Sequence, residues 1–201
     1  MQNSSKKPKS DILRLAVTLC LIAGITAALV SLVNAITEPE ITRRNNEKTA
    51  QSLKAVMPLA DEFEQYEYTD GSVISDDGKE VTIDGVWRAK NKDGYVGFCI
   101  KVSPKGYGGA IETIVGINSD LEVTDAQIIS MSETSGIGTK IQDDGFLSQF
   151  VGKSGKITGV ASLPEKDEIQ TISGATKSSK AFLRGINAAL TVAAQISGGE
   201  N

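Results

Sequence analysis

Residues 172–179, ISGATKSS, concentrate hydroxyl side chains at the predicted start of a long amphipathic helix. A helix amino terminus offers free backbone N–H groups and the positive end of the helix dipole, and both favour a phosphate. The small residues before Thr176 keep the approach open, and Lys177 adds a cation. The Thr176 hydroxyl would lie beside the phosphate, where the two groups could form an ester. The alternative is that Ser173 only caps the helix.

Two further segments are rich in glycine and interrupt sequence of β type. Residues 131–141, MSETSGIGTKI, combine glycines with hydroxyl groups and an acid, which suits a loop whose backbone approaches a ligand closely. Residues 103–117, SPKGYGGAIETIVGI, place an aromatic ring in a glycine-rich turn before a strand. An ordinary hairpin turn would have a similar composition and need no ligand.

Composition excludes several kinds of chemistry. The chain of 201 residues contains no histidine, which removes imidazole bases, Ser-His-Asp and Cys-His arrangements and most zinc sites. Cys20 and Cys99 lack the spacing of metal ligands, and we interpret both as small buried hydrophobic residues. The net charge of -4 gives no case for nucleic-acid binding. Hydrolysis by these routes is therefore excluded, and we assign no catalytic residue and no metal site.

A long apolar segment near the amino terminus predicts a membrane anchor. From Leu15 about twenty residues carry no charge, which is enough to cross a bilayer as a helix. Val33-Asn34-Ala35 would also suit signal-peptide cleavage, and a buried helix of a soluble protein is a third interpretation. We favour a retained anchor because the segment exceeds the length of a usual signal-peptide core and has no polar face. We assign residues 1–37 to the cytoplasmic terminus and this anchor.

The charges around the apolar segment predict its orientation. Four basic residues precede it: Lys6, Lys7, Lys9 and Arg14. The positive-inside rule then favours a cytoplasmic amino terminus in the cell (inner) membrane, in a single-pass chain. The rest of the chain would be extracytoplasmic, or periplasmic in a cell with two membranes.

The remaining sequence predicts a stalk followed by one domain. Residues 38–80 are expected to form a helical stalk and then an acidic peripheral loop, with Pro58 ending the helix. Residues 81–201 begin with four β-type runs separated by turn signals, which predict an antiparallel meander. A short helix is expected at 143–153 and a long one at 175–199. The apolar stripe of the long helix comprises Phe182, Ile186, Ala189, Leu190 and Ala193. The expected fold class is α+β: a single amino-terminal transmembrane helix, then an antiparallel sheet flanked by helices.

In order and combination, the three glycine-rich segments resemble the FMN-binding domain of RnfG, a component of Rnf electron-transport complexes, and of its relative NqrC. The matching residues are Ser173-Gly174-Ala175-Thr176 for the S-G-A-T motif, Glu133 to Gly138 for E-T-P-G-L/I-G, and Gly106 to Ile111 for G-Y-G-x-x-I. Two positions depart from the family pattern. Ser135 stands where the family usually has proline, and Gln170 stands where an aspartate often precedes the motif.

The resemblance implies FMN as the cofactor, attached covalently through a phosphoester to Thr176. It also implies FMN contacts from Ser173, Gly174, Ala175, Lys177, Ser178, Glu133, Thr134, Gly136, Ile137, Gly138, Lys140, Tyr107 and Gly108. It implies maturation by a flavin transferase and partnership with the other membrane subunits of an Rnf complex. The chain would relay electrons in a ferredoxin:NAD⁺ oxidoreductase coupled to ion translocation, and the complex would carry the enzymatic activity.

Two other functions remain open at this stage. A stand-alone extracytoplasmic flavoprotein with covalent FMN would deliver electrons to a small-molecule reductase. A flavin-free tethered binding domain would use the S-G-A-T motif only as a helix cap.

Overall fold

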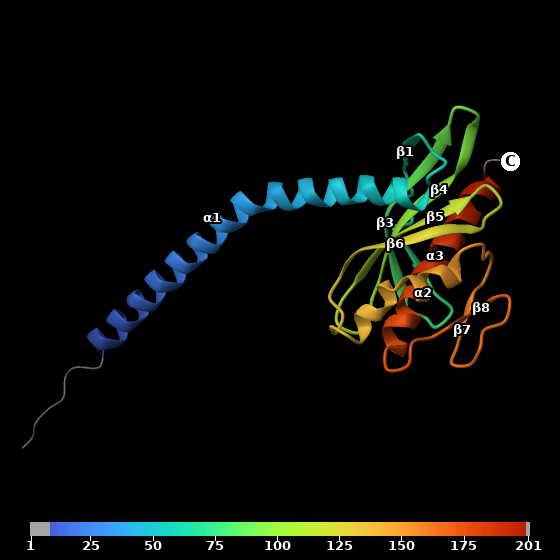
Figure 1. Cartoon of the computed structure of the whole chain (residues 1–201). Helices are drawn as coiled ribbons and strands as arrows, with labels where there is room; N and C mark the ends of the chain where they lie inside the picture. The colour runs from blue at the N-terminus through green and yellow to red at the C-terminus, as the bar shows by residue number, and fades with distance from the viewer. Residues whose placement is uncertain (1–8, 200–201) are drawn as a thin grey trace, which may run out of the picture. The chain divides into compact units, whose positions relative to one another are not determined.

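The computed structural model describes residues 9–199, which divide after Glu47 into two compact units (Figure 1). Helix α1, Lys9–Val56, forms the first unit, and its last turns from Lys48 onward belong to the second. The second unit contains the sheet and the remaining helices. Lys6 and Lys7, two of the basic residues that predict the orientation, lie outside the described residues.

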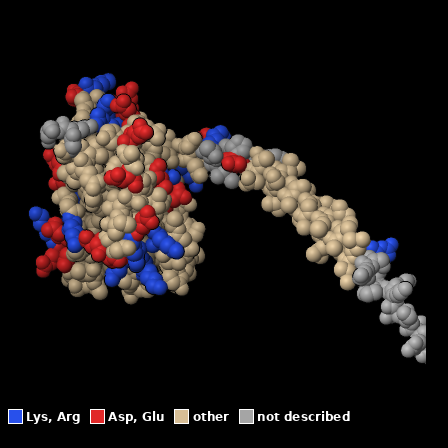
Figure 2. All heavy atoms as spheres, turned by 180° about the vertical axis from the view of Figure 1, so that it is seen from behind, with Lys and Arg blue, Asp and Glu red and all other residues tan. Residues whose placement is uncertain are grey.

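The first unit presents an apolar helical surface with no protein cover. Within α1, Ile12–Ala35 has a mean hydropathy of 2.4 over its most apolar window, and none of that window is buried. This stretch of 24 residues would be about 36 Å long, enough for a bilayer core of about 30 Å. Figure 2 shows it as an uncharged surface. Cys20 is exposed on this surface, so its interpretation as a buried residue is wrong, whereas Cys99 is buried.

Hydroxyl groups in and beside the apolar stretch are satisfied within the helix. Thr18, Thr26 and Thr37 each donate to the carbonyl four residues earlier, at 2.7–2.8 Å. Such bonds remove the cost of placing an unpaired hydroxyl in an apolar medium. The helix can therefore carry these threonines and still serve as an anchor.

The helix becomes charged beyond the apolar stretch. Arg43 pairs with Glu40 at 2.9 Å and with Glu47 at 2.6 Å, and Arg44 pairs with Glu40 at 2.7 Å. Hydrogen bonds from the two arginines lower the pKa of Glu40, and the bond from Arg43 has the larger effect. Pairs spaced three or four residues apart support a water-exposed helix.

The second unit contains a six-stranded sheet in the order β1-β3-β4-β5-β6, with β2 also paired to β3. The strands are β1 Glu62–Tyr66, β2 Ser72–Ile74, β3 Glu80–Asn91, β4 Gly94–Pro104, β5 Ile111–Asn118 and β6 Val123–Met131. All these pairings are antiparallel. The predicted α+β fold with an antiparallel meander is confirmed.

The sheet begins earlier in the chain than expected. β1 and β2 fall within the segment that was expected to be an acidic peripheral loop, and both pair with β3. In β1 the charged Glu62 and Glu64 are exposed, while Phe63 packs against the core. An edge strand tolerates charges on its solvent side, so the acidic composition concealed a strand.

Helix α3, Thr176–Gly199, covers one face of the sheet (Figure 1). Its predicted apolar stripe is buried and joins Phe98, Ile100 and Val102 of β4 in the main core. Alternate residues of a strand point to opposite faces, so Cys99 lies on the other side. There it packs with Leu53 and Met57 in a second core.

The short helix predicted at 143–153 is broken into turns. It comprises α2, Asp144–Leu147, and the 3₁₀ turn η2, Ser148–Phe150, preceded by the 3₁₀ turn η1, Gly138–Gln142. Phe146 and Phe150 pack on Phe182 of α3, with ring centroids 5.7 and 5.2 Å away. Two further short strands, β7 Thr158–Val160 and β8 Glu168–Gln170, form a parallel pair that was not predicted.

Candidate functional site

The S-G-A-T motif forms a tight turn that leads directly into α3. The N–H of Ala175 donates to the carbonyl of Ile172 at 3.0 Å. Gly174 within this turn has a φ of +80°, a conformation that favours glycine over residues with a side chain. The turn ends at Thr176, the first residue of the helix.

Ser179 ties this turn to the helix. Its hydroxyl accepts a hydrogen bond from the N–H of Ile172 at 3.1 Å and donates to the carbonyl of Ala175 at 3.0 Å. Ser173, which the alternative interpretation made the cap, is exposed and its side chain forms no hydrogen bond to any described residue. Sequence reasoning missed Ser179. Its only signal was a third hydroxyl residue after Thr176 and Ser178.

The helix start divides into exposed and buried side chains. Thr176 and Lys177 are exposed, whereas Ser178 and Ser179 are buried. The N–H groups of Thr176, Lys177 and Ser178 belong to a first turn, where a helix supplies no acceptor of its own. The exposed hydroxyl of Thr176 therefore lies beside free donors, as the phosphate hypothesis requires.

Glu133 joins all three glycine-rich segments. Its Oε1 accepts hydrogen bonds from the N–H groups of Tyr107 at 2.8 Å and Gly108 at 3.0 Å. Its Oε2 accepts a hydrogen bond from the buried hydroxyl of Ser178 at 2.5 Å. The structure thus brings together four predicted site residues from segments far apart in the sequence. They meet through the carboxylate of Glu133.

Glycines surround Glu133 because no side chain would fit. A Cβ on Gly106 would lie 2.3 Å from Oε1 of Glu133. A Cβ on Gly138 would lie 2.8 Å from Oε2 and 3.0 Å from the Ser178 hydroxyl oxygen. A Cβ on Gly108 would lie 2.0 Å from the carbonyl oxygen of Ser132. The glycines of the two loops therefore permit close backbone approach to the carboxylate.

The loop after Glu133 is held by hydrogen bonds between its own residues. The carbonyl of Thr134 accepts from the N–H groups of Ile137, Gly138 and Thr139, at 2.9–3.3 Å. The N–H of Gly136 donates to the hydroxyl of Thr139 at 2.9 Å. These bonds define the loop although Ser135 replaces the usual proline. Thr139 was not predicted, because its role depends on how the loop folds.

An aromatic and an apolar side chain stand exposed beside this network. Tyr107 is 66% exposed and Ile137 is 49% exposed. The Lys177 ammonium lies 5.1 Å from the centroid of the Tyr107 ring. This cation–π contact joins the glycine-rich loop that contains Tyr107 to the start of α3. Lys140 is exposed in η1, and its side chain makes no hydrogen bond or ion pair with the described residues.

The arrangement fits a flavin mononucleotide. A phosphate would meet the first-turn N–H groups of α3 and the Lys177 ammonium, next to the Thr176 hydroxyl. Tyr107 and Ile137 offer flat and apolar surface of the kind that an isoalloxazine ring requires. No described cluster of three or more Asp, Glu or Cys residues could hold a metal ion.

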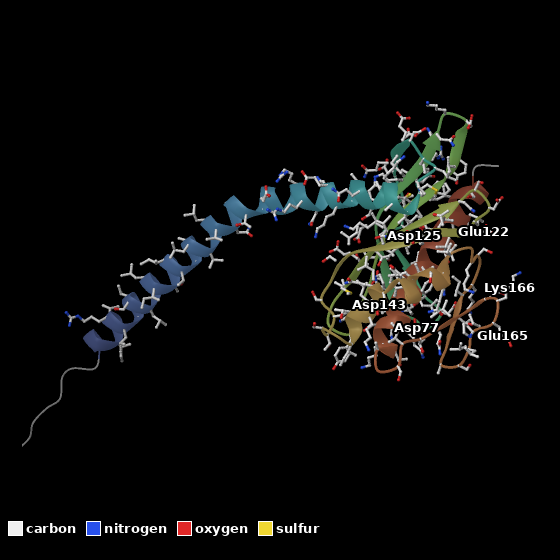
Figure 3. The ribbon with its side chains drawn as sticks, in the orientation of Figure 1. Asp77, Glu122, Asp125, Asp143, Glu165 and Lys166 are labelled. Carbon is white, nitrogen blue, oxygen red and sulfur yellow. The ribbon has the colours of Figure 1, made fainter. Side chains whose placement is uncertain are left out.

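A cavity of the domain lies away from these residues. It has a volume of about 830 Å³ and is lined by Ile74, Leu121, Leu183 and Arg184, but not by Thr176 or Glu133. At its edge Arg184 pairs with Asp77, labelled in Figure 3, at 3.3 Å. The exposed residues of the proposed site, among them Tyr107, Ile137 and Thr176, do not line this cavity.

Two family models match the chain. The model of the FMN-binding domain matches residues 106–191, which include all three glycine-rich motifs. The model of the RnfG N-terminal region matches residues 1–56, which include the apolar stretch of α1.

Curated relatives match over nearly their whole length. The G subunit of an ion-translocating oxidoreductase complex from Methanosarcina acetivorans is 31% identical, over 90% of this chain and 93% of that protein. The G subunit of a Na⁺-translocating ferredoxin:NAD⁺ oxidoreductase complex from Acetobacterium woodii is 29% identical, over 90% and 91%. The G subunit of a proton-translocating ferredoxin:NAD⁺ oxidoreductase complex from Clostridium ljungdahlii is 27% identical, over 96% and 98%.

A solved structure shares the fold. The C subunit of the Na⁺-translocating NADH-quinone reductase from Parabacteroides distasonis superposes with a TM-score of 0.53 at 18% identity. The match covers 74% of this chain and 92% of that one. The solved structure supports the fold alone. The two family models and the relative with 31% identity show the family: the chain belongs to the RnfG family, the G subunits of ion-translocating oxidoreductase complexes with an FMN-binding domain.

Proposed function

We propose that this chain is the membrane-anchored flavoprotein subunit of an Rnf-type ferredoxin:NAD⁺ oxidoreductase complex, and that its FMN is attached by a phosphoester to Thr176. The observation that carries the proposal is the exposed Thr176 hydroxyl at the first residue of α3, beside loops that Glu133 holds together. Bound FMN supplies the redox chemistry, and the protein supplies position and electrostatics.

The residues of the site would have separate tasks. The first-turn N–H groups of α3 and the Lys177 ammonium bind the phosphate. Tyr107 and Ile137 face the ring, together with backbone of the loop from Thr134 to Gly138. The exposure of this surface allows the cofactor of a partner to approach. A covalent link keeps the flavin in place although the site is shallow.

Attachment requires an outside catalyst. The chain has no histidine, and no described carboxylate hydrogen-bonds to the Thr176 hydroxyl. A flavin transferase would therefore supply the base and an activated donor, a flavin nucleotide with a phosphoanhydride bond. The Thr176 Oγ1 forms a bond to phosphorus, the anhydride bond breaks, the nucleoside monophosphate leaves, and the hydroxyl proton passes to the transferase.

The partners would be the other membrane subunits of the Rnf complex, because relatives of nearly the same length are named as subunits of such complexes. The match to the RnfG N-terminal region favours this function over a stand-alone flavoprotein. Ion translocation would reside in those subunits, since the one candidate span in the described residues carries no charged pathway. Purification in mild detergent should recover integral membrane subunits with the chain. Recovery of the chain alone would favour the stand-alone function.

Substitution of Thr176 tests the attachment. In cells that contain the transferase, Thr176→Val should abolish covalent FMN, because the shape is kept and the nucleophilic oxygen is lost. Thr176→Ser should retain part of it. The measurement is in-gel flavin fluorescence after denaturation, with mass analysis of the peptide that contains residue 176. Thr191→Val is the control, because Thr191 is an exposed threonine on the same helix. Covalent FMN on the Thr176→Val chain would overturn the assignment.

A further inference from the structure

Both oxygens of the Glu133 carboxylate are engaged within the protein. One accepts the N–H groups of Tyr107 and Gly108, and the other accepts the Ser178 hydroxyl. Hydrogen bonds to a charged acceptor are stronger than those between neutral groups. The carboxylate therefore has little capacity left for a ring that would approach from outside.

The space around Glu133 also limits its movement. The Cα atoms of Gly106 and Gly138 face the two carboxylate oxygens so closely that even one extra carbon on either would collide. A side chain enclosed by backbone in this way keeps one rotamer. Its position, in turn, fixes the backbone that encloses it.

From this geometry we infer that Glu133 is a positioning residue, whose carboxylate sets the spacing between the flavin-facing loops and the helix start that carries Thr176. Ser178 is the partner of Glu133 on the helix, and its hydroxyl links the helix start to the carboxylate. The inference rests on the proposed function for what it says about FMN. The network itself exists without the cofactor.

The position of the charge has a second consequence. The Glu133 carboxylate accepts the backbone N–H groups of Tyr107 and Gly108, and Tyr107 is proposed to face the flavin ring. The carboxylate thus holds a negative charge near the proposed ring surface. This charge opposes further negative charge on a nearby flavin, so its removal should shift the flavin reduction potential to more positive values.

Three variants of the full-length chain test the inference. Glu133→Ala and Ser178→Ala should each slow covalent FMN attachment about tenfold at equal amounts of folded protein. The double variant should be little worse than either one, because both changes break the same link. Glu133→Gln should restore most attachment: its amide oxygen can accept from Tyr107 and Gly108, and its amide nitrogen can donate to Ser178. The flavin of Glu133→Gln should nevertheless show the positive shift in potential.

Hydrogen exchange of the chain without FMN gives a readout independent of the cofactor. The amides of Tyr107 and Gly108 should exchange faster in Glu133→Ala, and at nearly the wild-type rate in Glu133→Gln. Unchanged exchange in Glu133→Ala would overturn the inference. So would full attachment in both alanine variants. If the wild type itself never acquires FMN, the proposed function fails, whereas the exchange result still decides the role of Glu133.

A second hydroxyl–carboxylate pair provides matched controls. Ser103 donates to the carboxylate of Asp84 between β4 and β3, and neither residue belongs to the network around Glu133. Ser103→Ala and Asp84→Ala should therefore leave FMN attachment and the Tyr107 and Gly108 amides unchanged. Slower attachment in these controls, to the same degree, would show that the effect is general destabilisation and would overturn the inference.

Discussion

Ser178 and Ser179 are neighbours on α3, both are buried, and their hydroxyls bond in different directions. Ser178 reaches the Glu133 carboxylate in another segment, whereas Ser179 bonds back to Ile172 and Ala175 in the motif turn. The first bond relates the helix to the loops, and the second shapes the turn before Thr176. The reactive hydroxyl of Thr176 is therefore not sufficient by itself. The hydroxyls of Ser178 and Ser179 are needed to hold the helix start and the turn around it.

Gly138 offers a test at the scale of a single carbon atom. Gly138→Ala would place a Cβ 2.8 Å from both the Cβ and Oε2 of Glu133. We expect a loss of about 1–3 kcal/mol in the free energy of unfolding, and reduced FMN attachment. Gly145→Ala is the control, because its Cβ would have no neighbour within 4 Å in α2, where alanine is the better helix former. Thermal unfolding compares the two. Equal stability of Gly138→Ala and the wild type would contradict the crowding.

At the scale of elements, the end of α1 is part of the folded domain. Leu53, Val56 and Met57 are almost fully buried in the second core. The Thr124 hydroxyl of β6 donates to the carbonyl of Val56 at 2.6 Å, which satisfies a group left free at the helix end. Gly116 of β5 allows the approach, since a Cβ there would lie 2.4 Å from the same carbonyl oxygen. The last turns of α1, which belong to the domain unit, are therefore fixed to the sheet.

Leu53→Ala tests this attachment. We expect it to lower the free energy of unfolding by about 2–5 kcal/mol, because it opens a cavity beneath the helix. Cys99, which lies in the same core, should then react faster with a thiol reagent in a Cys20→Ala background. Leu59→Ala serves as the control, since Leu59 is 73% exposed and should affect neither quantity. Wild-type reactivity of Cys99 in Leu53→Ala would show that the helix end does not protect it.

Cys99 also gives this core a pH dependence. Burial raises the pKa of its thiol to about 12, whereas an unfolded cysteine has a pKa of about 8.5. Between these values the unfolded state has lost a proton that the folded state keeps. The contribution of the buried Cys99 thiol to the free energy of unfolding is therefore complete below about pH 8.5 and declines as the pH rises toward 12. In Cys99→Ala this decline should be smaller, and denaturant unfolding at about pH 8 and about pH 10 measures the difference.

For the whole molecule, the predicted orientation puts the flavin domain outside the cytoplasm. Leu163 is 85% exposed, so Leu163→Cys in a Cys20→Ala background should react with a membrane-impermeant maleimide on intact cells or spheroplasts. Gln2→Cys should react only after permeabilisation. Cys99 should stay unlabelled in both, because it is buried. Labelling of Gln2→Cys but not Leu163→Cys on intact cells would reverse the orientation.

Sequence patterns predicted the features that depend on local chemistry. The apolar span follows from its length without charge, the meander from β-type runs between turn signals, and the stripe of α3 from helical periodicity; all three appear in the fold. β1 was missed because charges on an exposed edge resemble a loop, and β7 and β8 because three-residue strands leave little periodic signal. The Glu133 network was beyond prediction, since a carboxylate that bonds Tyr107, Gly108 and Ser178 is visible only once three distant segments meet.

In the proposed membrane-anchored flavoprotein, the short interval between the span and the domain limits how far the flavin can move from the bilayer. Only residues 36–47 separate Ala35, the end of the apolar stretch, from Lys48, where the domain unit begins. Even fully extended, a dozen residues reach about 42 Å. The cofactor would therefore stay in a thin layer next to the bilayer. Proteins anchored in the same bilayer have a high effective concentration in that layer, whereas freely diffusing carriers do not. Exchange of electrons would thus be fastest with neighbours that share the membrane.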